Sequence, residues 1–150
     1  MPGTYSQLLL HIVFSTKHRE PWITCDIADR LYPYIGGIIR AEKGALYDIG
    51  GVEDHVHLYL RWRMDESVSN LMRTVKARSS KWVHEMFPQL APFAWQEGYA
   101  AFSVSKSQEN AVKHYIATQR EHHEKEDFKT ELLRLLRAHG VEFDERYVCD

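Results

Sequence analysis

Two short patterns in this sequence combine residue types that can do chemistry. The first is His55-Val56-His57, in a segment whose alternation sends Val56 and its apolar neighbours to one face of a strand and both histidines to the other. Neutral imidazoles two residues apart on a strand can share one divalent metal ion. The pattern predicts a metal site, although with nine histidines in the chain an incidental pair of strand histidines stays open as the alternative.

The second pattern is Tyr115 and Gln119, which lie four residues apart on a predicted helix and therefore share one of its faces. If this helix lies across the strand face that carries the histidines, Gln119 supplies a third ligand and Tyr115 reaches a phosphate bound at the metal. Tyrosine is an established nucleophile in covalent catalysis. Its hydroxyl ionises only near a pKa of about 10, so it needs help to lose its proton, and the sequence identifies no base. His122 and His123 follow closely and are further candidate ligands.

The elements that must position these residues follow from hydrophobic periodicity and turn residues. Apolar or alternating segments predict strands, and amphipathic segments that begin at polar cap residues and end near glycine or proline predict helices. The predicted strands cover residues 5–15, 45–50, 56–62 and 93–105, and the predicted helices cover 24–42, 67–86, 107–119 and 127–139. This order predicts an α+β fold: a ferredoxin-like split βαβ core with a four-stranded antiparallel sheet and extra C-terminal helices.

The size and composition of the chain are those of a single domain. A chain of 150 residues with 44% hydrophobic content can bury one sizeable core, which we place at about residues 5–124, followed by a helical tail at about 125–150. The two cysteines, Cys25 and Cys149, are far apart and indicate neither a disulfide framework nor a zinc site. The apolar segment 8–14 is too short to span a membrane. We therefore expect a cytoplasmic protein with no membrane partner.

Charge is unevenly distributed along the chain. The net charge is −2, yet residues 121–150 hold five Lys or Arg against nine Asp or Glu, so the rest of the chain is slightly basic. A local surplus of positive charge lies on the predicted helix that follows the two histidines. Such side chains can track the phosphates of a nucleic acid, while a solvated helix face is the simpler alternative. The candidate DNA-binding residues are Lys17, Arg19, Arg73, Lys76, Arg78 and Lys81.

Several segments together resemble one family, the single-tyrosine HUH transposases of the IS200/IS605 type. The opening segment 11–21, the HUH segment 54–57 and the helix at 67–80 are similar to the corresponding segments of that family, and Tyr115 with Gln119 matches its nucleophile and third metal ligand. Residues 122–125 and 139–147 are similar to the tail of a subgroup. Two departures are Glu53, where a proline is common, and residues 99–105, which differ from the usual fourth strand.

The resemblance implies a specific activity. It implies a metal-dependent transposase and endonuclease that cleaves and rejoins single-stranded DNA at hairpin-bearing element ends, in a bacterial or archaeal cell and at the nucleoid. Tyr115 would attack the phosphate and leave a 5′-phosphotyrosine and a free 3′-hydroxyl. Mg²⁺ or Mn²⁺ held by His55, His57 and Gln119 would polarise that phosphate.

A homodimer with composite active sites is a further expectation, partly from the same resemblance. Each site would combine the histidines of one subunit with Tyr115 of the other. The unpaired edge of an open four-stranded sheet favours such an assembly, because a two-fold partner can cover it.

Three alternatives compete with this assignment. A 2H-type phosphoesterase needs two His-x-Ser/Thr motifs, but His57 is followed by Leu58 and Tyr59 and no second copy exists. A non-catalytic ferredoxin-like module would bind nucleic acid through the basic helix and would need no metal. A domesticated relative that processes chromosomal palindromic repeats would have the same active site.

Overall fold

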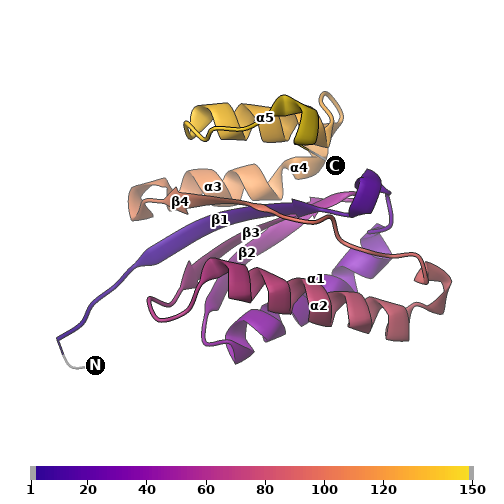
Figure 1. Ribbon diagram of the computed structural model, residues 1–150, viewed down its shortest axis with the longest axis horizontal. Coiled ribbons are helices and arrows are strands. Elements are labelled where there is room, and N and C mark those ends of the chain that lie inside the picture. The colour runs from indigo at the N-terminus through magenta and orange to yellow at the C-terminus, as the bar shows by residue number, and fades with distance from the viewer. Residues whose placement is uncertain (1–2, 149–150) are drawn as a thin grey trace.

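The computed structural model describes residues 3–148 and shows one four-stranded antiparallel sheet between two layers of helices (Figure 1). The strands are β1 (Leu8–Ser15), β2 (Ala45–Val52), β3 (His55–Trp62) and β4 (Ala100–Val104), in the spatial order β2-β3-β1-β4. One face is covered by α1 (Cys25–Ala41) and α2 (Val68–Met86), and the other by α3 (Glu109–Ala117), α4 (Gln119–His123) and α5 (Phe128–Ala138). Single turns of 3₁₀ helix cover Lys17–Arg19, Pro88–Leu90, Lys106–Gln108 and Glu145–Tyr147. The predicted α+β fold with extra C-terminal helices is confirmed.

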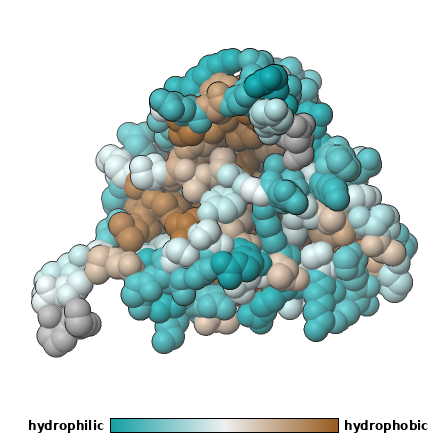
Figure 2. All heavy atoms as spheres, viewed as in Figure 1, coloured by the Kyte–Doolittle hydropathy of each residue, from teal (hydrophilic) through white to brown (hydrophobic). Residues whose placement is uncertain are grey.

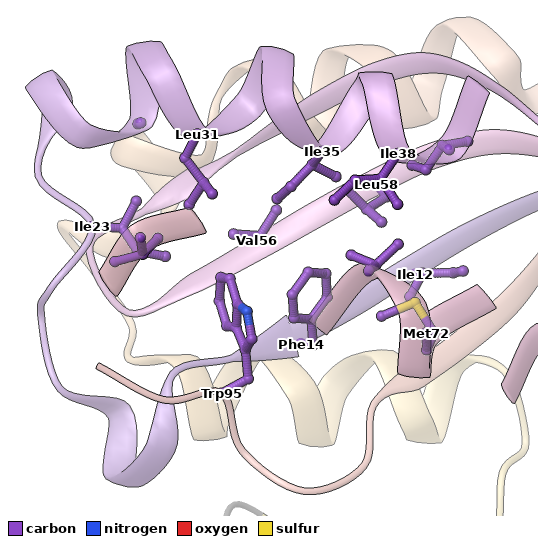
Figure 3. Packing of buried hydrophobic residues seen from close by; sticks show 14 of the residues in the cluster. Ile12, Phe14, Ile23, Leu31, Ile35, Ile38, Val56, Leu58, Met72 and Trp95 are labelled. Carbon is purple, nitrogen blue, oxygen red and sulfur yellow. The ribbon is translucent and has the colours of Figure 1, made fainter. Parts of the chain in front are cut away.

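The main core lies between the sheet and the layer formed by α1 and α2 (Figure 3). Alternation along β1 and β3 sends every second side chain of these central strands into this core. Its buried residues include Ile12 and Phe14 of β1, Val56, Leu58 and Leu60 of β3, Leu31, Ile35, Ile38 and Ile39 of α1, and Leu71, Met72 and Val75 of α2. The side chains between them, His55 and His57 among them, consequently point to the opposite face.

The opposite face of the sheet is covered by α5 and α3. The helix α5 packs an apolar stripe against β1 and β4, in a cluster formed by Val13, Phe102, Phe128, Leu132, Leu135 and Leu136. In the space-filling view, apolar side chains gather between this helix and the sheet, while hydrophilic side chains form the outer surface (Figure 2). Ile116 of α3 packs with Leu9 and Tyr59. The tail of the chain therefore lies over the sheet face that carries the two histidines.

Most predicted elements begin and end within a few residues of their expected positions. Ser67 caps α2, because its hydroxyl accepts a hydrogen bond of 3.0 Å from the backbone N–H of Asn70. Asp127 caps α5 in the same way, through a bond of 2.8 Å from the N–H of Thr130. The first strand is shorter than predicted and begins at Leu8 instead of residue 5.

Two predicted elements differ from the structure. The strand expected over residues 93–105 is confined to β4, because Phe93 and Trp95 turn into the main core and Lys76 holds the loop beyond them through the carbonyl of Gln96 at 3.0 Å. The helix expected over residues 107–119 is interrupted at Thr118, whose φ of −104° and ψ of 20° separate α3 from α4. The interruption places Gln119 at the start of the second, shorter helix.

Helix α3 approaches β2 very closely at Gly50. A Cβ atom at this position would lie 2.8 Å from Cγ2 of Ile116 and 2.9 Å from its carbonyl oxygen. Contacts this short are not tolerated, so the missing side chain lets the helix that carries Tyr115 rest directly on the sheet.

Gly50→Ala should therefore lower the free energy of unfolding by about 1–3 kcal/mol, because the added methyl group forces α3 away from the sheet. Gly37→Ala is the matched control: its Cβ would meet only the end of the Arg40 side chain, at 3.9 Å. Because alanine is preferred to glycine in a helix interior, Gly37→Ala should raise the free energy of unfolding by about 0.5–1 kcal/mol. Urea denaturation measures both values, and a Gly50→Ala protein as stable as the wild type would contradict the close packing.

Candidate metal centre and nucleophile

His55 and His57 lie next to each other on the same face of β3. Their ring centroids are 5.1 Å apart, and both side chains have 0% exposure. The predicted alternation along this strand is thus observed. Because a buried imidazole needs polar partners, the residues around these rings determine what the pair can do.

Helices α3 and α4 bring Tyr115 and Gln119 to the two histidines. The Oε1 of Gln119, which is only 1% exposed, lies 3.0 Å from Nε2 of His55. The ring centroid of Tyr115 lies 5.7 Å from that of His57. All four residues come from one chain, so a second subunit, as expected for a composite site, is not needed to bring these groups together.

A fifth residue, Glu131 of α5, lies at the centre of this group. Its Oε1 is 3.1 Å from Nε2 of His55, 3.3 Å from Nε2 of His57 and 2.9 Å from Nε2 of His123. The carboxylate has 0% exposure. Three imidazole nitrogens from two elements of the fold therefore converge on one oxygen atom.

The second oxygen of Glu131 faces the other two residues of the site. Oε2 accepts hydrogen bonds from the hydroxyl of Tyr115 and, at 2.9 Å, from Nε2 of Gln119. Glu131 was not among the site residues predicted from the sequence. The signal that could have found it is an acidic residue within the apolar stripe of an amphipathic helix, between Phe128 and Leu132, where a charge is buried and needs a partner.

Two further side chains orient the histidine rings. The Nδ1–H of His55 donates to Oδ1 of Asp54 at 2.7 Å, and Nδ1 of His57 shares a hydrogen bond of 2.8 Å with Nε2 of His11. Each bond occupies the Nδ1 of a ring and leaves its Nε2 directed at Glu131. Metal-ligating histidines in proteins have outer partners of this kind. His11 was not a predicted site residue, because only the pairing of β1 with β3 brings it there.

Burial and charge divide the histidines into neutral and charged rings. Burial lowers the pKa of His57 to about 4 and the pKa of His11 to about 3, so both rings are neutral at about pH 7. Burial also opposes a charge on His55, but the carboxylates of Asp54 and Glu131 outweigh it and raise the pKa of His55 to about 9. An imidazolium at His55 therefore lies beside the buried carboxylate of Glu131.

Glu131 and Tyr115 depart from their ordinary values in opposite directions. Burial disfavours a charge on Glu131, yet hydrogen bonds from His123, His55 and His57 outweigh it and hold the pKa of Glu131 well below its usual range. Burial and the adjacent carboxylate raise the pKa of the Tyr115 hydroxyl well above its usual range, and Arg134 opposes them only in part. Tyr115 is accordingly a neutral phenol at about pH 7.

The arrangement fits a divalent cation. Neighbouring ligands of a six-coordinate ion, with bonds of about 2.1 Å at right angles, lie about 3.0 Å apart. The separations of 3.0 to 3.3 Å that join His55 to Gln119 and both histidines to Glu131 match this spacing. Imidazole nitrogens together with carboxylate and amide oxygens suit several divalent metals. His55, His57 and Glu131, whose ligand atoms lie within 4.8 Å of one another, thus form a candidate metal centre beside Gln119.

A hollow of about 430 Å³ opens next to the tyrosine. Its lining includes His122, Lys125 and Arg134. The ring of His122 lies 4.8 Å from the ring of Tyr115, and Nη2 of Arg134 lies 3.2 Å from the Tyr115 hydroxyl. On the side that faces solvent, the half-buried nucleophile candidate therefore has the guanidinium of Arg134 beside its hydroxyl. Glu121 and Glu126 line the same hollow, and Glu126 pairs with Arg134 at 2.6 Å.

The basic residues predicted on α2 do not lie at this centre. Arg73, Arg78 and Lys81 are exposed on a helix that covers the opposite face of the sheet (Figure 1). Lys76 is half-buried, donates to the carbonyl of Gln96, and has its pKa lowered by burial to about 8. These four side chains form a region separate from Tyr115.

The other two predicted DNA-binding residues lie closer to the histidines. Lys17 and Arg19 are exposed in the turn that directly follows β1. The last residue of that strand, Ser15, pairs with His55 of β3. This turn is consequently at the end of the sheet that carries the candidate centre.

Comparison with known sequences identifies relatives that share most of the chain. A family model described as IS200-like transposase matches residues 4–119. The chain is also 24% identical over 129 residues to the ISDra2 transposase TnpA of Deinococcus radiodurans, across 83% of this chain and 90% of that relative.

Two solved structures share the fold. A candidate transposase from Deinococcus radiodurans R1 has a TM-score of 0.66 at 22% identity, over 79% of this chain and 95% of that chain. A REP-associated tyrosine transposase bound to a REP hairpin has a TM-score of 0.61 at 14% identity, over 82% of this chain and 73% of that chain. Between residues 3 and 148, no helix combines the length and apolar character of a membrane span. Because the family model covers the chain from before β1 to Gln119 of α4, the chain belongs to the IS200-like transposase family.

Proposed function

We propose that this transposase cleaves and rejoins single-stranded DNA through a covalent bond to Tyr115. The observation that carries the proposal is the convergence of the Tyr115 hydroxyl and the Nε2 atoms of His55 and His57 on one buried carboxylate. A nucleophile beside a metal-binding group is the arrangement that covalent phosphoryl transfer requires. Membership of the family supports DNA as the substrate.

The proposed cofactor is Mg²⁺ or Mn²⁺. His55, His57 and Gln119, the ligands expected from the sequence, would hold it together with Glu131. When bound, such an ion polarises a phosphate oxygen and offsets the charge that develops in the transition state. Asp54, bonded to His55, and His11, bonded to His57, keep the two ligand rings in the required orientation.

The chain itself supplies the nucleophile and a phosphate-binding surface. The Tyr115 oxygen attacks phosphorus in line with the departing 3′-oxygen, which yields a 5′-phosphotyrosine and a free 3′-hydroxyl. Arg134, adjacent to the Tyr115 hydroxyl, would contact the phosphate from the neighbouring hollow. Attack by another 3′-hydroxyl reverses the step, so that strands are joined without an external energy source.

The proposed substrate carries hairpins at the ends of a mobile element. A structural relative that is bound to a REP hairpin supports this choice, and it equally suits a domesticated role on chromosomal palindromes. Lys17 and Arg19 would contact the strand near the cleavage site, and the exposed Arg73, Arg78 and Lys81, with Lys76, would position more distant phosphates. The proposed location is the cytoplasm, at the nucleoid.

Tyr115→Phe should abolish the covalent adduct and leave hairpin binding intact, because only the attacking oxygen is lost from a ring that still packs. A denaturing gel of labelled hairpin oligonucleotide incubated with Mg²⁺ detects the protein-linked strand. Tyr5→Phe, which changes a side chain with 91% exposure, is the control and should retain full activity. A persistent adduct with Tyr115→Phe would reject the nucleophile, and no adduct with the wild type would favour a non-catalytic binding module.

Binding of Mn²⁺ at about pH 7.5 should release about one proton per ion. His55 must give up the proton that its pKa of about 9 lets it hold, whereas His57 is already neutral. Affinity should therefore rise with pH up to about 9. Calorimetry in buffers of different ionisation enthalpy counts the protons; release near zero would contradict a protonated His55, and His55→Ala should lose the binding.

The homodimer stays a prediction, and complementation tests whether its sites are composite. A His55→Ala/His57→Ala protein is mixed with Tyr115→Phe under conditions in which subunits exchange. Because one chain brings its own Tyr115 to its own histidines, we expect no adduct from the mixture. A regained adduct on the histidine-deficient subunit, identified by mass spectrometry, would instead support the composite sites that the family resemblance implies.

A further inference from the structure

The hydroxyl of Tyr115 has two side-chain hydrogen-bonding neighbours in the part of the chain that the structure describes. It donates to Oε2 of Glu131, and Nη2 of Arg134 lies 3.2 Å from it. A guanidinium has donors only, whereas a carboxylate oxygen has free lone pairs. Of these two neighbours, only Glu131 can take up the phenolic proton.

The two oxygens of this carboxylate have separate partners. Oε1 faces the Nε2 atoms of His55, His57 and His123, whereas Oε2 faces Tyr115 and Gln119. One oxygen is therefore directed at the candidate metal centre and the other at the nucleophile. The division leaves Oε2 available to the hydroxyl even when Oε1 serves as a ligand.

The packing of α5 holds the carboxylate in this place. Phe128, one turn before Glu131, stacks on the ring of His55 with centroids 4.5 Å apart. Leu132 and its neighbours along the apolar stripe bury the same helix face against β1 and β4. Glu131 is thus carried by a rigid element and has no solvent exposure, so it is already in position before any substrate binds.

We propose that Glu131 is a catalytic residue of this transposase: its Oε2 is the general base that accepts the proton of Tyr115 during strand cleavage. The inference rests on the proposed function of Tyr115. As the bond between the tyrosine oxygen and phosphorus forms, the phenolic O–H bond breaks and its proton moves to Oε2. The bond from phosphorus to the 3′-oxygen breaks, and that oxygen takes a proton from water. The proton then leaves Oε2 to water. In the joining step an incoming 3′-hydroxyl loses its proton to water, and the released tyrosine oxygen regains one from water through Oε2 of Glu131.

Two other roles for the same contacts make different predictions. If Glu131 only ties the tail to the sheet, its removal should lower stability without changing the chemistry of Tyr115. If it occludes the site until DNA arrives, its removal should accelerate cleavage. A general base predicts a slower chemical step that a more acidic nucleophile can partly restore.

The test compares Glu131→Gln with Glu124→Gln, which removes the same charge from an exposed position in the same tail. The single-turnover rate of adduct formation should fall about 10²–10⁴-fold for Glu131→Gln and stay unchanged for the control. An amide oxygen binds Mn²⁺ more weakly than a carboxylate, so both proteins are compared at Mn²⁺ concentrations that saturate them, as followed by electron paramagnetic resonance. Hairpin affinity should change less than about tenfold. Replacing Tyr115 by 3,5-difluorotyrosine, a more acidic phenol, should restore Glu131→Gln at least about tenfold and alter the wild type far less.

A second variant covers the case in which Glu131→Gln does not fold. Glu131→Ala leaves space at the buried site, and added formate should restore adduct formation in proportion to its concentration. Three results would overturn the inference: either variant cleaving as fast as the wild type or faster, no gain from the fluorinated tyrosine, or no response to formate by folded protein. If the wild type forms an adduct through Tyr115 and one of these three results is obtained, only the role of Glu131 as general base is rejected. If the wild type forms no adduct, the proposed function and the role of Glu131 are both rejected.

Discussion

A carboxylate with no solvent exposure is the constraint on which the rest of the site depends. Taking such a charge out of water costs several kcal/mol, on the order of the stability of a whole domain, unless donors or a cation replace its hydration. Glu131 is compensated by three imidazole nitrogens on one oxygen and by Tyr115 and Gln119 on the other. Because these partners belong to β3, α3 and α4, one side chain joins the tail helix to the sheet and to both segments that carry the proposed chemistry.

The negative charge of the buried Glu131 carboxylate can be compensated in two ways. Without a metal, the imidazolium of His55 lies against the carboxylates of Asp54 and Glu131, and the other buried rings stay neutral. A divalent ion would take the place of that proton, at separations between ligand atoms that already match its coordination shell. Both states would use the same His55, His57 and Glu131 side chains, which are already buried together. Preorganisation of this kind lowers the free-energy cost of assembling an active site.

The main hydrophobic core and the residues of the proposed active site lie on opposite faces of the sheet. The largest core lies between the sheet and α1 with α2, whereas the polar cluster lies on the other face beneath α3, α4 and α5 (Figure 1). The match to the family ends at Gln119, so it includes the histidines and Tyr115 but stops before α5. Glu131 and Arg134 therefore lie in the tail, outside the residues that the family model matches, and Glu131 is buried although the tail has an excess of acidic residues.

The local features of this protein follow from its amino-acid sequence alone. Period-two alternation placed His55 and His57 on one face and Val56 with Leu58 on the other, and Ser67 marked a helix start through its own side chain. The order of elements determined the α+β class. Which elements meet depends on the way the chain packs: the pairing of β1 with β3 brings His11 to His57, and the packing of α5 brings Glu131 to Tyr115. The limits of the fourth strand and the break at Thr118 were likewise set by packing, as with Trp95, which is drawn into the core. Contacts between residues far apart in sequence produce no periodic pattern in the sequence. For that reason Glu131, the proposed base, could not be predicted from the sequence.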